Sequence, residues 1–168
     1  MFEHLADHDR ILVTGPQRSG TTIAARMIAA DTGHTYIDED RFRVTDVAAW
    51  RRLLAQDGVT VHCPHMLKRI VDDPPMGCLV VLMRRRLGDI HASIDRIGWS
   101  HAPTELRLFG VSAGDPAKLK YDYWASADKA FPYIELRYSD LRRHRLWIGR
   151  TERQGFEPRQ TERSADGR

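Results

Sequence analysis

The 168-residue sequence has few of the features that would direct a chain out of the cell or into a membrane. Each of its two cysteines, Cys63 and Cys78, lies in an apolar run. They therefore predict buried thiols in a reducing compartment and exclude a disulfide framework. No apolar stretch is long enough to span a bilayer, and the first residues have no signal-peptide core. We therefore expect a cytoplasmic protein without membrane contact.

A large excess of one charge is also missing. The formal net charge is only +3 and the sequence pI is near 9.1, with the basic residues in local clusters. This balance argues against a nucleic-acid partner and favours a small anionic ligand. The length predicts a single domain over residues 1–149. Dense mixed charge with little apolar content predicts a flexible tail over residues 150–168.

Short apolar runs alternate with helical patterns along the chain. The runs predict strands at residues 11–14, 34–37, 59–63, 78–83 and 133–137. The helical patterns cover residues 20–31, 45–56, 64–71, 88–98 and 116–130. Repeated β-then-α units of this kind predict an α/β fold with a central parallel sheet covered on both faces. Residues 99–117 are looser and predict a lid or substrate loop.

Residues 11–22 are the most informative segment and read Ile-Leu-Val-Thr-Gly-Pro-Gln-Arg-Ser-Gly-Thr-Thr. A buried strand, a loop of small residues and a helix start are what a phosphate site requires, because the first N–H groups of a helix have no partners within the helix. The spacing resembles a Walker A loop, but Thr21 stands where that loop has its lysine, and the cation is Arg18. This difference argues against an ordinary ATPase or kinase.

A second cationic segment follows the strand predicted at residues 78–83. The strand leads into Arg84, Arg85 and Arg86, and open α/β sheets bind ligands at the carboxyl ends of their strands. Asp89 is placed to cap or start the next helix, and Ser93 can face the same crevice as the arginines. The apolar stripe predicted to face the sheet from this helix is Ile90, Ile94 and Ile97.

These two segments together resemble the sulfotransferases that use 3′-phosphoadenosine 5′-phosphosulfate (PAPS). That family has Lys or Arg followed by Ser-Gly-Thr-Thr in its phosphosulfate loop, and an Arg-x-x-x-Asp-x-x-x-Ser pattern after a later strand. Here the first pattern is residues 18–22 and the second is Arg85, Asp89 and Ser93. The resemblance implies a three-layer P-loop-type fold in a short bacterial or phage-type member of the family. It also implies an enzyme that moves a sulfuryl group from PAPS to a hydroxyl or amine of a small-molecule or carbohydrate acceptor.

The resemblance assigns roles to individual residues. Arg18 is the loop cation that stabilises charge on the leaving phosphate. The 5′-phosphate would be held by Arg18, Ser19, Gly20, Thr21 and Thr22. Arg85 and Ser93 would bind the 3′-phosphate, although Arg84 or Arg86 could take the role of Arg85. No metal is needed in the family, and no convincing ligand set for one is present in the sequence.

The general base is left open among three residues. His62 and His65 follow the third predicted strand, and His62 occupies the place where the family often has lysine. Glu39, within the acidic triplet 38–40, is the rival. Trp99 and Trp124 are candidates for lining the acceptor pocket, whereas the pattern around Trp50 indicates a core residue.

Two other functions remain open from the sequence. A small-molecule or nucleotide kinase with a degenerate P-loop would use the acidic triplet 38–40 to orient magnesium or its substrate. A non-catalytic nucleotide-binding domain would keep Arg18 and Arg85 but would not need a base.

Overall fold

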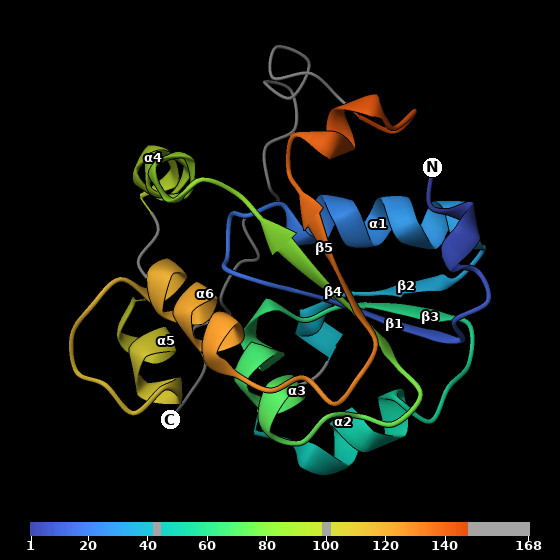
Figure 1. The fold of residues 1–168 in the computed structure, drawn as a ribbon, viewed down its shortest axis with the longest axis horizontal. Helices are drawn as coiled ribbons and strands as arrows, with labels where there is room; N and C mark the ends of the chain where they lie inside the picture. The colour runs from blue at the N-terminus through green and yellow to red at the C-terminus, as the bar shows by residue number, and fades with distance from the viewer. Residues whose placement is uncertain (42–44, 99–101, 148–168) are drawn as a thin grey trace, which may run out of the picture.

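The computed structural model describes residues 1–41, 45–98 and 102–147 (Figure 1). Its centre is a five-stranded sheet in which every pairing is parallel, in the order β2-β3-β1-β4-β5. The strands are β1 (Arg10–Thr14), β2 (Thr35–Ile37), β3 (Val59–His62), β4 (Leu79–Arg84) and β5 (Tyr133–Arg137). The predicted α/β class and the parallel sheet flanked by helices are confirmed.

Six α-helices and four short 3-10 helices accompany the sheet in the described residues. The α-helices are α1 (Thr21–Thr32), α2 (Val47–Leu53), α3 (Leu67–Asp72), α4 (Leu87–Ile97), α5 (Ala102–Leu108) and α6 (Pro116–Ser126). The 3-10 helices are η1 (Glu3–Leu5), η2 (Glu39–Arg41), η3 (Pro64–Met66) and η4 (Asp140–Arg143). Figure 1 shows α1 on one side of the sheet and α2, α3 and α6 on the other.

The alternation of side chains along the central strands builds a core on each face of the sheet. In β1, Ile11 and Val13 pack with the buried residues of α1, such as Met27. Leu12 points to the other face, where it joins a cluster that includes Trp50 of α2. Strands buried on both faces explain why the apolar runs in the sequence are continuous.

The order of the strands decides where a ligand site is expected. The chain leaves β1 toward β2, whereas it leaves the neighbouring β4 in the opposite direction, toward β5. Open α/β sheets bind ligands beyond the carboxyl ends of the strands at such a reversal. Here the loop 15–20 follows β1, and Arg85 and Arg86 follow Arg84, the last residue of β4.

The sequence predictions for α4 and for the segment after it need correction. Of the predicted apolar stripe on α4, Ile90 is buried, but Ile97 is 46% exposed. The helix lies beyond the end of β4 and not against the sheet, so it has no sheet face to cover (Figure 1). Asp89 is in its first turn, but the N-cap residue is Arg86. The segment predicted as a loop over residues 99–117 contains the helix α5, so part of it is helical.

The predictions for the tryptophans have different outcomes. Trp124 is buried in the core and donates from Nε1 to Glu135 at 2.8 Å, so it does not line a pocket as predicted. Trp50 is buried in the core as predicted. Trp99 and the tail predicted for residues 150–168 lie outside the described residues.

Candidate functional site

The loop between β1 and α1 has the backbone form of an anion-binding nest. Its φ angles are positive at Gly15 (137°), Arg18 (65°) and Gly20 (101°). A Cβ on Gly20 would lie 2.5 Å from Cδ2 of Tyr138, so this position requires glycine for space as well as for conformation. Gly20 caps α1 without a side-chain hydrogen bond, which leaves the first N–H groups of the helix for a ligand.

Three arginine side chains converge beside this loop. Nε of Arg18 and an Nη of Arg96 donate to the same acceptor, Oγ of Ser93, at 3.1 and 3.3 Å. Arg85 donates from an Nη to the carbonyl oxygen of Arg18 at 2.8 Å, and its guanidinium stacks on Tyr138. Burial, followed by the charges of Arg96 and Arg85, lowers the pKa of Arg18. Among the described residues no carboxylate is bonded to any of the three arginines, so the cluster is left without a counter-charge.

Buried polar atoms without partners lie in the same region. Oγ of Ser19 and Nε of Arg85 are inaccessible to solvent and have no hydrogen-bond partner within the described part of the chain. Such atoms are costly to leave unpaired. Both belong to segments that meet at the crevice, and both can donate to an anion.

The three consecutive arginines after β4 are now distinguished by their contacts. Arg84 makes a bidentate ion pair with Glu135 of β5, at 2.9 and 3.0 Å, and stacks on Tyr121. Arg86 is exposed at the start of α4. Of these three arginines, Arg85 is the one whose side chain is bonded to the loop.

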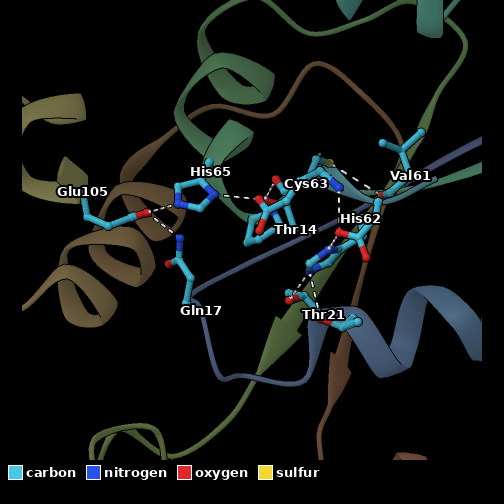
Figure 2. Close-up of polar contacts among 12 residues, drawn as sticks. Thr14, Gln17, Thr21, Val61, His62, Cys63, His65 and Glu105 are labelled. Atoms are coloured by element: carbon cyan, nitrogen blue, oxygen red, sulfur yellow. Dashed lines mark hydrogen bonds and ion pairs between the residues drawn. The ribbon is translucent and has the colours of Figure 1, made fainter. Parts of the chain in front are cut away.

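His62, the last residue of β3, lies against the start of α1 (Figure 2). Its Nε2 is 2.9 Å from Oγ1 of Thr21 and 3.2 Å from Oγ1 of Thr22, and its Nδ1 is 3.1 Å from Oδ1 of Asp38. Because a carboxylate can only accept, Nδ1 donates to Asp38, while Nε2 faces the two hydroxyls. The bond from His62, with that from Tyr36, holds the pKa of Asp38 well below its usual range despite partial burial.

His65 is held differently, between two carboxylates. Its Nδ1 is 2.6 Å from Oε2 of Glu39 and its Nε2 is 3.0 Å from Oε1 of Glu105 (Figure 2). Burial lowers the pKa of His65, but the bonds to Glu105 and Glu39 outweigh it and raise the pKa to about 9. At neutral pH the imidazole is therefore protonated, and this state is unsuited to a general base.

The pH dependence of the free energy of unfolding should reveal the protonation of His65. The unfolded pKa of histidine is about 6.5, and the folded value is about 9. The contribution of His65 to stability is therefore complete below about pH 6.5 and is lost as the pH rises to about 9. We expect the free energy of unfolding, measured by urea titration, to fall over this range. In a His65→Gln variant the fall should be smaller, and an unchanged slope would contradict the ion pairs.

A buried ion pair lies next to His65. Lys120 of α6 and Glu105 of α5 are 1% and 2% exposed, and their side chains form a salt bridge. Lys120 also donates to Oε1 of Gln17 at 2.6 Å and to the carbonyl oxygen of Pro64 at 3.0 Å. Gln17 in turn donates to Glu105. The pair thus joins the loop, the end of β3 and the two helices.

Charges are divided along the carboxyl edge of the sheet. Asp38 and Glu39 follow β2, and the two histidines follow β3. The loop follows β1, and the arginine cluster lies on the side of β4 and α4. Within the described part of the chain, the edge therefore runs from the carboxylates of Asp38 and Glu39 to guanidinium groups that have no carboxylate partner.

The structure brings the predicted site residues to one edge of the sheet in two groups. Arg18, Ser93 and Arg85 form the first group, through the contacts described above. His62 joins the second group with Thr21 and Thr22, while Glu39 contacts His65. The sequence reasoning missed Arg96, which lies three residues after Ser93 and so on the same helix face. It also missed Gln17, Glu105 and Lys120, and the last two have no local signal because their partners are distant in sequence.

A surface hollow of about 220 Å³ lies away from these residues. Its lining residues are Val47, Trp50, Arg51, Leu54, Arg69, Asp73, Pro74, Pro75 and Met76. They belong to α2, α3 and the segment before β4, and none is a predicted site residue.

Comparison with protein-family models, with curated proteins and with solved structures gave no match. Within residues 1–41, 45–98 and 102–147, no group of three or more His, Cys, Asp or Glu side chains is arranged to hold a metal ion. In the same part of the chain, no helix has both the length and the apolar character needed to cross a membrane.

Proposed function

We propose that this chain is a PAPS-dependent sulfotransferase with a P-loop-type fold, acting on a hydroxyl or amine acceptor. The observation that carries the proposal is the convergence of Arg18, Arg85 and Arg96 beside the loop, where no carboxylate of the described residues is bonded to them. Arg18 and Arg85 are half-buried, and like charges gathered there repel one another unless an anion joins them. The start of α1 offers an anion site of its own, so a ligand with two separate anionic groups fits best.

The residues present fit adenosine 3′,5′-bisphosphate, the part of PAPS that remains after transfer. The nest 15–20 and the hydroxyls of Thr21 and Thr22 would receive the 5′-phosphate. Arg85, Arg96 and Ser93 would receive the 3′-phosphate, since guanidinium groups match phosphate oxygens. The unpartnered Oγ of Ser19 and Nε of Arg85 supply further donors. The lysine with which a P-loop binds a nucleoside triphosphate is absent, because position 21 is a threonine, whose hydroxyl is bonded to His62.

PAPS supplies an activated sulfuryl group whose S–O bond to the 5′-phosphate breaks as the acceptor oxygen or nitrogen bonds to sulfur, releasing adenosine 3′,5′-bisphosphate. Arg18 stabilises the negative charge that grows on the leaving phosphate. It does so as a fixed charge, because a guanidinium keeps its proton at ordinary pH.

His62 is the proposed base. Asp38 accepts from Nδ1 and would stabilise the imidazolium that forms. Nε2 contacts the hydroxyls of Thr21 and Thr22, and once these hydroxyls donate to the 5′-phosphate, Nε2 is free to take the proton of the acceptor. His65 keeps both nitrogens on carboxylates and takes no part in proton transfer.

The binding site is tested by calorimetric titration of the purified protein with adenosine 3′,5′-bisphosphate, with ATP and with magnesium-ATP. We expect tight binding of the bisphosphate without metal and weak binding of both ATP forms. A preference for magnesium-ATP would overturn the proposal in favour of a kinase that uses Asp38 and Glu39. Tight bisphosphate binding without transfer to any acceptor would favour a non-catalytic nucleotide-binding domain.

The assignment of the base predicts a selective loss of turnover. His62→Gln should lower kcat by about 10²- to 10⁴-fold, the usual contribution of general acid–base catalysis. The dissociation constant of the bisphosphate, measured by calorimetry, should change little because the loop and the arginines remain. His34→Gln, at a histidine beside the amino end of the sheet, is the matched control. Unchanged turnover in His62→Gln would transfer the role of base to Glu39.

A further inference from the structure

The buried ion pair of Lys120 and Glu105 is not used by the proposed chemistry. The ammonium group of Lys120 has three hydrogens and three acceptors, Oε1 of Gln17, the carbonyl oxygen of Pro64 and the carboxylate of Glu105. With 1% of its surface exposed, Lys120 cannot touch a substrate. Burial lowers its pKa, while Glu105 acts in the opposite direction and favours the charged form.

A buried ion pair of this kind adds little to the stability of the fold by itself. Removing two charges from water is costly, and apolar residues of similar size often serve a core as well or better. What an ion pair adds is a defined geometry, because each hydrogen bond requires its partner at one distance and angle. The consequence of this pair should therefore be sought in what it holds in place.

The group that the pair holds is the side-chain amide of Gln17. Its oxygen accepts from Lys120 and its nitrogen donates to Glu105, so the two opposite charges bind the two polar atoms of one amide. The residue that follows is Arg18, whose φ of 65° is in the left-handed region. For a residue with a side chain, this conformation costs on the order of 1 kcal/mol and persists only when the surroundings impose it.

We propose that Lys120 and Glu105 are positioning residues that act through Gln17 to hold the loop 15–20 in its anion-binding form before any ligand arrives. From the other side, Arg85 holds the carbonyl oxygen of Arg18. The loop is thereby fixed at two successive residues, so a ligand would meet it without a reorganisation cost at binding. The part of this inference that concerns ligand binding rests on the proposed function. The part that concerns the conformation of the loop without ligand does not depend on it.

The free loop is tested by hydrogen exchange of its backbone amides in the protein without ligand. Lys120→Met and Gln17→Ala should raise the exchange rate of the Ser19 amide, which donates to the carbonyl oxygen of Pro16, by about tenfold or more, as expected when local opening becomes easier. Lys118→Met is the control, because Lys118 is an exposed lysine of the same helix and pairs only along the helix with Asp122. It should leave loop exchange unchanged. If Lys120→Met fails to fold, Gln17→Ala decides, since Gln17 is only half-buried.

Swapping the amide and the carboxylate between positions 17 and 105 distinguishes a positioning role from a packing role. Gln17→Glu alone sets a second carboxylate against Glu105 and should weaken binding of adenosine 3′,5′-bisphosphate by about 10- to 100-fold through loss of preorganisation. Adding Glu105→Gln restores one amide and one carboxylate around Lys120, with the same total charge. The double variant should recover the wild-type affinity and exchange rate to within about threefold.

The outcomes separate the two proposals. Loop exchange at the wild-type rate in both Lys120→Met and Gln17→Ala would overturn the positioning role, and so would a double variant that folds but shows no recovery. If the wild-type protein does not bind the bisphosphate, the proposed function fails, while the exchange rates still decide whether Lys120 and Glu105 hold the loop.

Discussion

Replacing Arg18 with glycine is expected to abolish turnover while leaving the fold at least as stable as that of the wild type. In the proposed mechanism the guanidinium stabilises charge on the leaving group, and removing one such donor typically costs about 10²- to 10³-fold in kcat. Glycine accepts the positive φ of this position without strain, so the free energy of unfolding should not fall. Initial rates with PAPS and urea unfolding curves measure the two effects.

Two further variants sharpen this result. Arg18→Ala keeps the strained φ and should lose both turnover and, by about 1 kcal/mol, stability relative to Arg18→Gly. Arg142→Ala removes an exposed arginine of η4 and controls for the change in net charge. Turnover that survives in Arg18→Gly would remove Arg18 from the mechanism.

Replacing Arg85 with alanine is expected to separate ligands that have a 3′-phosphate from those that lack one. A hydrogen bond to a charged group is worth about 1.5–3 kcal/mol, so adenosine 3′,5′-bisphosphate should bind about 10- to 100-fold more weakly. Adenosine 5′-phosphate should lose less, because its phosphate would lie in the nest at the start of α1, where Arg85 acts only through the carbonyl oxygen of Arg18. Calorimetric titration of both ligands gives the comparison.

The neighbouring arginine provides the matched control. Arg86 is exposed and adjacent in sequence, so Arg86→Ala makes the same change in charge at the same end of β4 without touching the loop. It should alter neither affinity by more than about threefold, as expected for a surface site. Equal weakening of both ligands by Arg85→Ala would refute a role specific to the 3′-phosphate.

The sheet could be predicted from the sequence because its strands have strong local signals. The residues of β5 were predicted without error, β1, β2 and β3 differ from prediction by one residue at one end, and β4 differs by one residue at each end. Helix α5 was missed because it is only seven residues long, begins beside Pro103 and has its buried residue Glu105 paired with partners far away in sequence. A local sequence pattern does not identify partners that are distant in the chain.

That the predicted site residues lie at one edge of the sheet could be anticipated in outline, but their contacts could not. The loop 15–22 was singled out by its spacing, and Ser93 by the resemblance to the sulfotransferase pattern. Distinguishing Arg85 from Arg84 required β5, because the ion pair with Glu135 is what turns Arg84 away from the loop. Distinguishing His62 from His65 required the positions of Asp38, Glu39 and Glu105, because His65 lies between two carboxylates and His62 contacts one carboxylate and two hydroxyls.

The division of charge along the sheet edge also has a kinetic consequence. A dianionic ligand approaching this edge is attracted toward the arginine end and repelled from Asp38 and Glu39, so its phosphates are oriented during the encounter. The field that does this is screened over about 8 Å at physiological ionic strength. Added salt should therefore slow association much more than it speeds dissociation, and a stopped-flow series in sodium chloride would show the effect in the second-order rate constant.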